Sequence, residues 1–371
     1  MSINTAIGQA YPERLRPRAL ALMSACWIIP SLAGPPLAGL VSEWWSWRMV
    51  FHGLAALTVL PAIVLAVALR GAAWHRPALP ADPAGPAPDS RGSAPSRPPL
   101  LLAAGVSLGA ALAQYGVSGW DVRHLLFAAG GFALLVVLAP RLLPPGTWRA
   151  AQGLPATVLL CGLSSGTYFT IEAFAPLMLI DERNVSTVVT GLAFTGAALA
   201  WAAASWVQGR LLEERPRHRL VAVGALIMTV AAGLAVAGSL PGAPVLAAAA
   251  AMPVAAVGMG LLAPSLTVLS LSHSAPGRQG HASSAMQTAQ NLGQITVMAL
   301  SSAVLNAGIG AGASPSGGYG AAFGLLLVPT VVVLLLAGRA RAARGTVVAG
   351  SGGRTPAAGD NRASAVGGHA D

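Results

Sequence analysis

Long apolar runs separated by short polar segments dominate this sequence. Ten runs approach the length of about 20 residues that a helix needs to cross a bilayer. They lie close to residues 18–41, 49–69, 99–117, 124–140, 154–179, 187–208, 219–239, 244–271, 284–308 and 319–338. The runs are rich in Ala, Leu and Gly and do not alternate between apolar and polar residues, so strands are not expected. The pattern predicts an all-α, polytopic membrane helix bundle with about ten transmembrane helices.

The composition favours the same class. Of the 371 residues, 54% are hydrophobic and 9% are charged, whereas a soluble domain carries about 25% charged residues. The formal net charge of +10 could indicate a nucleic-acid-binding protein, but all 22 basic residues are Arg and stand in short clusters between apolar runs. That distribution is typical of membrane-protein loops, so we expect a lipid bilayer as partner and exclude nucleic acid.

The Arg residues also predict an orientation. Alternate loops hold 19 of the 22, and the intervening loops hold only Arg48, Arg123 and Arg183. Since basic loops stay on the cytoplasmic side, both termini are expected in the cytoplasm of a multi-pass protein of the cell (plasma) membrane. Trp44, Trp45 and the neighbouring Trp47 then form an aromatic anchor at the outer surface.

A signature lies in and after the first run. It begins with Gly34-Pro35-Pro36-Leu37-Ala38-Gly39 and continues, beyond the helix end, with Trp47-Arg48-Met49-Val50-Phe51. Pro bends a helix and Gly permits close helix contact. The two elements resemble the fifth span, and the stretch outside it, of major facilitator antiporters. The preceding Tyr11-Pro12-Glu13-Arg14 is similar to that superfamily's loop between spans four and five.

Later segments extend the resemblance over nearly all of residues 1–340. Gly209, Glu213 and Arg219 match a degenerate second-half copy of the superfamily's loop motif, although Glu214 and Pro216 depart from it. The segments 258–264 and 280–293 are similar to spans ten and eleven.

The resemblance implies a division of the chain. The branch that fits is the fourteen-span drug:proton antiporters, built as six spans, two extra spans and six more. In that frame the chain lacks the first four spans, through a misplaced start, a truncated gene or a naturally short transporter. The implied parts are a remnant of the N-terminal half over 1–70 (the end of span four with spans five and six), a cytoplasmic linker over 71–98, two extra spans over 99–145, a six-span C-terminal half over 146–340 and a disordered cytoplasmic tail over 341–371.

The function implied is secondary active transport, as proton-coupled efflux of small amphipathic molecules. The alternative is a truncated fragment of such a transporter that does not itself transport. No enzymatic activity, cofactor or metal is expected. The chain has no phosphate-binding Gly-Lys-Ser/Thr loop, and its His residues are scattered.

Glu172 is the one acidic residue well inside an apolar run. An ionisable group in a membrane is costly and is a candidate functional site, here for protons or substrate. The alternative is a carboxylate that reaches interfacial water near the outer end of its helix.

A polar stripe in the run over 284–308 is the second candidate. The residues are Gln287, Gln290, Asn291 and Gln294, which share one helix face. They could line a substrate cavity, or they could serve only as interhelical hydrogen-bonding groups.

Overall fold

The computed structural model describes residues 33–73, 98–119, 121–212, 214–274 and 279–341. These residues form helices and no strands. A helix over 33–44 precedes α3. The remaining helices are α3 (Trp47–Ala73), α4 (Pro98–Gly116), α5 (Val122–Leu142), η1 (Thr147–Arg149), α6 (Leu154–Asp181), α7 (Thr187–Arg210), α8 (Arg217–Ser239), α9 (Val245–Ser272), α10 (Gln279–Gly310), α11 (Pro315–Leu336) and η2 (Ala337–Ala340).

The all-helical membrane class is confirmed. Each predicted run from 49–69 onward coincides with one of the helices α3 to α11. Eight described helices are long and apolar enough to cross a membrane, and Leu101–Gly116 forms a shorter apolar helix. Of the first predicted run, residues 18–32 lie outside the described residues, as do nearly all of the predicted linker and tail.

Two helix starts differ from the sequence prediction. α11 begins at Pro315, where the Ser314 hydroxyl accepts a hydrogen bond from the Gly317 amide at 3.2 Å. A Ser N-cap followed by Pro is a strong start signal that hydropathy alone does not register. α10 begins at Gln279, five residues before the apolar run, because its first turn is polar and continues the helix beyond the apolar segment.

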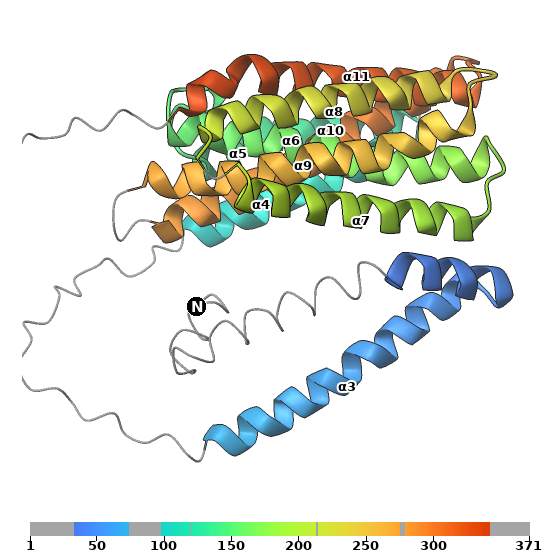
Figure 1. Ribbon diagram of the computed structural model, residues 1–371, viewed down its shortest axis with the longest axis horizontal. Helices are drawn as coiled ribbons and strands as arrows, with labels where there is room; N and C mark the ends of the chain where they lie inside the picture. Colours follow the sequence, from blue (N-terminus) through green and yellow to red (C-terminus); the bar gives the residue numbers. More distant parts are fainter. Residues whose placement is uncertain (1–32, 74–97, 120, 213, 275–278, 342–371) are drawn as a thin grey trace, which may run out of the picture.

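α9 is the central helix of the bundle. It packs against α6, α7 and α8, while α10 packs along α6 and α11 along α8 (Figure 1). One buried apolar cluster runs through α6, α8, α9 and α11 and includes Phe323, Leu266 and Met228. Glycines bring the helices close together: a Cβ added at Gly258 would lie 2.9 Å from the Gly224 carbonyl oxygen. Close contact through small residues is the usual way in which helices associate in lipid.

α4 and α5 form a hairpin beside this bundle. The Gly109 backbone meets Gly131 of α5, and Ala113 and Leu135 are buried between the two helices. The hairpin contacts α10 through Leu292 and Ile295. The Asn306 amide of α10 donates a hydrogen bond to the Val117 carbonyl at 2.7 Å, which ties the end of the hairpin to the bundle.

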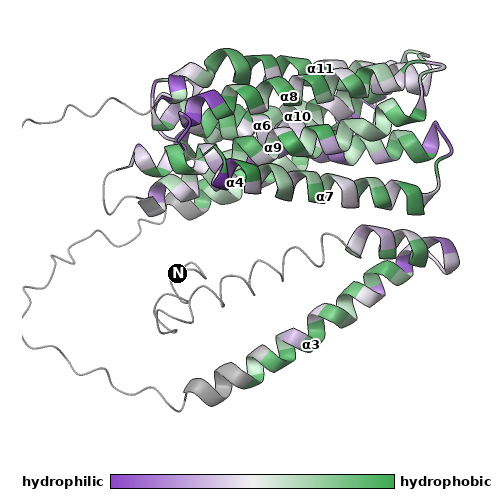
Figure 2. Cartoon of the chain, in the orientation of Figure 1, coloured by the Kyte–Doolittle hydropathy of each residue, from purple (hydrophilic) through white to green (hydrophobic). Residues whose placement is uncertain are grey.

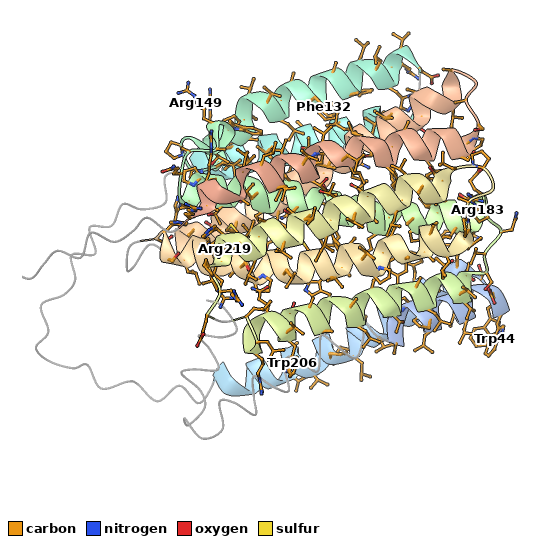
Figure 3. All side chains as sticks on the ribbon, turned by 45° about the horizontal axis from the view of Figure 1, so that its top comes forward. Trp44, Phe132, Arg149, Arg183, Trp206 and Arg219 are labelled. Carbon is orange, nitrogen blue, oxygen red and sulfur yellow. The ribbon has the colours of Figure 1, made fainter. Side chains whose placement is uncertain are left out.

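The outer surface of the helices is apolar, and the polar residues gather at their ends (Figure 2). Leu246, Leu335 and Val136 are each at least 70% exposed. Arg149 and Arg219 lie at one end, here called the basic end, whereas Arg183 and Trp44 lie at the opposite end (Figure 3). A surface of this kind is suited to hydrocarbon between two polar layers.

α3 is separate from the bundle. It leaves the other helices at an angle (Figure 1), and every described side chain from Phe51 to Val64 is exposed. The helix over 33–44 nevertheless contacts α7, as described below. Apolar side chains all around a helix require lipid or further helices as neighbours.

Candidate functional site

Glu172 lies inside the membrane segment of α6. It is half-buried and stands nine residues before Asp181, the last residue of the helix. At a rise of about 1.5 Å per residue, Glu172 is about 13 Å from that helix end. The embedded-site and interfacial interpretations of Glu172 both stay predictions.

A tyrosine one turn earlier holds the carboxylate. The Tyr168 hydroxyl donates a hydrogen bond to Glu172 Oε1 at 3.0 Å, and Tyr168 is itself only 4% exposed. The Trp201 ring of α7 packs edge-on against the Tyr168 ring with centroids 4.9 Å apart. No described residue donates a hydrogen bond to the other carboxylate oxygen. That oxygen is therefore free to take up a proton or to accept a hydrogen bond from a ligand.

α6 and α10 cross at glycines. The Gly162 and Gly293 backbones are in direct contact, and a Cβ added at Gly162 would lie 2.8 Å from the Ala289 carbonyl oxygen. Residues 289 and 293 form the face of α10 that meets α6, so the neighbouring polar residues of α10 flank this crossing.

The four polar residues of α10 do not form one cluster. Gln287 and Asn291 are exposed and pair with each other, the Gln287 amide nitrogen donating to Asn291 Oδ1 at 3.2 Å. Gln290 and Gln294 are half-buried and make no side-chain hydrogen bond to a described residue. Gln294 and Gln114 of α4 line a hollow of about 290 Å³. No hydrogen bond joins Glu172 to any of the four within the described part of the chain.

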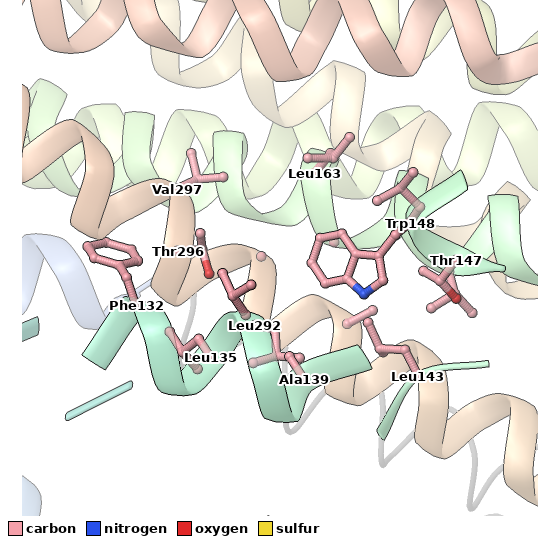
Figure 4. Close-up of a pocket in the computed structure, with 16 residues that line it drawn as sticks. Phe132, Leu135, Ala139, Leu143, Thr147, Trp148, Leu163, Leu292, Thr296 and Val297 are labelled. Carbon is pink, nitrogen blue, oxygen red and sulfur yellow. The ribbon is translucent and has the colours of Figure 1, made fainter. Parts of the chain in front are cut away.

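An apolar cavity lies at the α6–α10 crossing, where Gly162 and Gly293 are among its lining residues. Its volume is about 220 Å³, and its walls come from α5, η1, α6 and α10 (Figure 4). Phe132 and Trp148 are among the lining side chains, whereas the polar ones are Thr147 and Thr296. The Thr147 hydroxyl is engaged, since it donates to the Pro144 carbonyl at 2.6 Å. Such a cavity fits an apolar group better than a charged one.

The signature residues of the first run meet α7. Gly39 lies against the Thr187 backbone, and Gly191 lies against the Pro35 carbonyl. Glu43 Oε1 accepts hydrogen bonds from the Thr187 hydroxyl at 2.8 Å and from the Val188 amide at 3.4 Å, which caps the start of α7. These contacts explain Gly39, because a side chain there would strike the α7 backbone. Among the described residues, no atom lies within 4 Å of a Cβ added at Gly34.

Trp47 and Arg48 contact each other. The Arg48 guanidinium lies 4.9 Å from the Trp47 ring centre, and the Trp47 ring packs edge-on against Phe51. Trp44, Trp45 and Trp47 are all exposed at the end opposite the basic end. They are suited to the headgroup layer, as an aromatic anchor requires.

The second-half loop motif is only partly described. Gly209 is exposed in the last turn of α7, Arg219 is exposed in the first turn of α8, and Glu213 lies outside the described residues. The well-defined contacts are made instead by the residue before Gly209. Gln208 is 1% exposed and faces α9 and α8.

The neighbours of Gln208 fix the orientation of its amide. One amide atom faces the carbonyl oxygens of Gly260 and Leu261, at 3.2 and 2.7 Å, and must be the nitrogen because these groups only accept. The other accepts from Arg217 Nη1 at 3.2 Å and from the Ser265 hydroxyl at 2.8 Å. Gln208 thus joins the end of α7 to both α9 and α8.

These hydrogen bonds compensate for a backbone hydrogen bond that is missing in α9. Pro264 has no amide hydrogen, so the Gly260 carbonyl one turn earlier loses its partner within the helix. The Ser205 hydroxyl of α7 donates to that carbonyl at 3.2 Å, beside the Gln208 amide. α7 therefore supplies the hydrogen bonds that the proline removes from α9.

The comparisons with known proteins agree with this architecture. The profile described as Major Facilitator Superfamily matches residues 1–298, well over half of the chain. The chain belongs to the major facilitator superfamily. The resemblance stated from the sequence motifs is thus confirmed at the level of the superfamily.

Two curated relatives of this superfamily member are similar over most of its length. They are a "Probable multidrug-efflux transporter" of Mycobacterium tuberculosis strain CDC 1551 / Oshkosh and its counterpart in strain ATCC 25618 / H37Rv. Each is 27% identical over 348 residues, which cover 88% of this chain and 69% of the relative.

Two sets of contacts in this superfamily member were not predicted from the sequence, those of Tyr168 with Glu172 and those of Gln208 with α8 and α9. Tyr168 could have been found, because it stands one helical turn from Glu172 and can reach it. The hydrogen bonds of Gln208 were harder to predict, because a polar residue at the end of an apolar run is common in membrane helices. Its partners are brought to it only by the packing of α7 against α9 at Pro264. Within the described residues, no group of His, Cys, Asp and Glu could hold a metal ion.

Proposed function

We propose that this major facilitator protein is a proton-coupled efflux transporter of small amphipathic molecules, and that Glu172 carries the proton. The observation that carries the proposal is the half-buried Glu172 carboxylate held by Tyr168 deep in α6. Desolvation favours a protonated carboxyl group, and the approach of water or a cation favours release of the proton. A site that alternates between the two can couple proton entry to substrate exit.

The substrate class follows from the surroundings. The lining of the cavity between α5, α6 and α10 is almost wholly apolar, and Thr147 and Thr296 are its polar residues. Apolar walls with a few polar groups fit molecules that are partly apolar and partly polar. The printed names of the two mycobacterial relatives support efflux of several compounds.

We further propose the fourteen-span arrangement for this protein. α4 and α5 would be the extra pair, α6 to α11 the C-terminal half, and the helix over 33–44 with α3 part of the N-terminal half. The hairpin of α4 and α5 packs as a separate unit with its own buried residues, which supports this division.

The test of function is resistance and dye efflux in a bacterial host that lacks its own efflux pumps. Cells that produce the protein should extrude ethidium faster than cells with empty vector, and a protonophore should remove the difference. Efflux that survives the protonophore would contradict proton coupling. Equal efflux in both cell lines would contradict transport of this substrate class.

The exposure of α3 supports a second candidate, a chain that transports only when further helices are present. All described side chains from Phe51 to Val64 are exposed, and the described helices leave this face uncovered. The chain should then be compared, at matched expression, with a form extended by its in-frame upstream coding sequence. Efflux by the extended form alone supports this candidate, and equal efflux contradicts it. Whichever form extrudes dye is called the efflux-competent form below.

We propose that the basic end faces the cytoplasm, together with both termini. Reporter fusions in the efflux-competent form check this. Fusions after Arg149 and Arg219 should give cytoplasmic signals, and a fusion after Arg183 should give an external one. The reverse result at Arg219 would contradict the orientation, because the remaining charges follow the same alternation.

A further inference from the structure

A third cavity opens at the basic end of the bundle. It has a volume of about 680 Å³ and lies between the start of α8, the end of α9 and the residue that follows η2. Its lining includes Arg217, His218, Arg219, Val268, Leu269 and Arg341. Three Arg residues from two separate parts of the chain thus line one cavity, whose α9 wall includes Val268 and Leu269.

The positive charges of this cavity are not neutralised within the described part of the chain. Arg217 donates to the Gln208 amide oxygen at 3.2 Å, which is a neutral acceptor. No described carboxylate forms an ion pair with Arg217, Arg219 or Arg341. Cations gathered around a hollow repel one another and attract an anion of matching size. Guanidinium groups suit phosphate in particular, since their nitrogens match its oxygens in pairs.

The depth of the cavity favours a lipid over a dissolved ion. Arg217 and Arg219 occupy the first turn of α8, a helix of 23 residues that spans about 34 Å, so they lie at the bilayer surface. Val268 of α9 is 44% exposed beside them and continues into the apolar surface of the bundle. A ligand here meets cations at one end and hydrocarbon at the other, which is the pattern of basic lipid sites between helices.

We propose that this cavity binds the phosphate group of an anionic phospholipid, with Arg219 and Arg341 as its main contacts. The headgroup phosphate would lie among the guanidinium groups and an acyl chain against Val268. Because the site lies away from Glu172, the proposal goes beyond the transport function and is tested without measuring transport.

Native mass spectrometry of the purified protein in detergent tests the proposal. Phosphatidylglycerol and phosphatidylcholine with the same acyl chains are added separately, and bound lipid is counted. We expect phosphatidylglycerol to be retained in preference. The Arg219→Gln/Arg341→Gln double variant should retain at least about tenfold less of it, since each Arg near a lipid headgroup contributes appreciably to binding. Neither side chain makes a hydrogen bond in the described structure, so the variant should elute as the folded protein does.

Arg149→Gln is a control at the same end of the bundle. Arg149 is exposed at the same end but does not line the cavity. Retention of phosphatidylglycerol in this control supports a defined site, whereas equal losses in both variants would overturn the proposal in favour of general charge attraction. Equal binding of the two lipids would also overturn it. Displacement of the lipid by millimolar inorganic phosphate would show a site for free phosphate instead.

Discussion

Replacing Glu172 by glutamine is expected to remove uphill efflux from the efflux-competent form and to leave downhill exchange of substrate intact. Glutamine resembles the protonated carboxyl group in size and polarity but cannot release a proton. The variant would therefore cycle without responding to a pH gradient. In everted vesicles we expect the rate driven by the pH gradient to fall at least about 100-fold, the effect of losing an essential proton-transfer group.

Two further variants separate coupling from folding. Glu182→Gln makes the same chemical change at the C-cap of α6, beyond the apolar segment, and should keep the gradient response. Tyr168→Phe removes only the hydroxyl that positions the carboxylate, so it should shift the pH profile of efflux while a gradient response remains. A Glu172→Gln variant with the pH profile and rate of the unchanged protein would exclude this residue from coupling.

Replacing Gln208 by leucine is expected to destabilise the bundle by about 1–3 kcal/mol, because it leaves buried polar groups without partners. The Gly260 and Leu261 carbonyls would lose the amide, and the Arg217 guanidinium would lose its acceptor. Thermal unfolding in detergent measures the change. We also expect reduced efflux, since only the Ser205 hydroxyl would then join α7 to α9 beside Pro264.

The control for this prediction is Gln152→Leu. Gln152 is exposed in the segment before α6 at the same end of the bundle, so the same substitution there leaves no buried group unpaired. The prediction fails if the two variants unfold at the same temperature. In that case the hydrogen bonds around Pro264 would add no stability beyond what lipid or water can supply.

The sequence was sufficient for the helices because the bilayer imposes a simple rule. Each span must be apolar for about 20 residues and must satisfy its own backbone hydrogen bonds. The runs from 49–69 onward therefore predict α3 to α11 directly. Helix ends follow capping chemistry instead, which is why the Ser314-Pro315 start of α11 was missed.

The candidate site was harder to predict, because its contacts depend on how helices pack. Helical spacing places Gln287 and Gln294 on one face of α10. In the structure, Gln287 is exposed and pairs with Asn291, whereas Gln294 lines a hollow together with Gln114 of α4. The hairpin of α4 and α5 decides that difference, and no local pattern in α10 reveals it. The Gly39 contact with α7 likewise depends on tertiary packing, although the Gly-Pro signature indicated close approach.

Reconstitution of the efflux-competent form in liposomes with an internal pH dye tests the central claim most directly. An ethidium gradient is applied with no initial pH difference, and proton movement is recorded. The account predicts that protons move opposite to ethidium, and that Glu172→Gln moves ethidium without protons. Ethidium transport by the unchanged protein with no change in internal pH would contradict it.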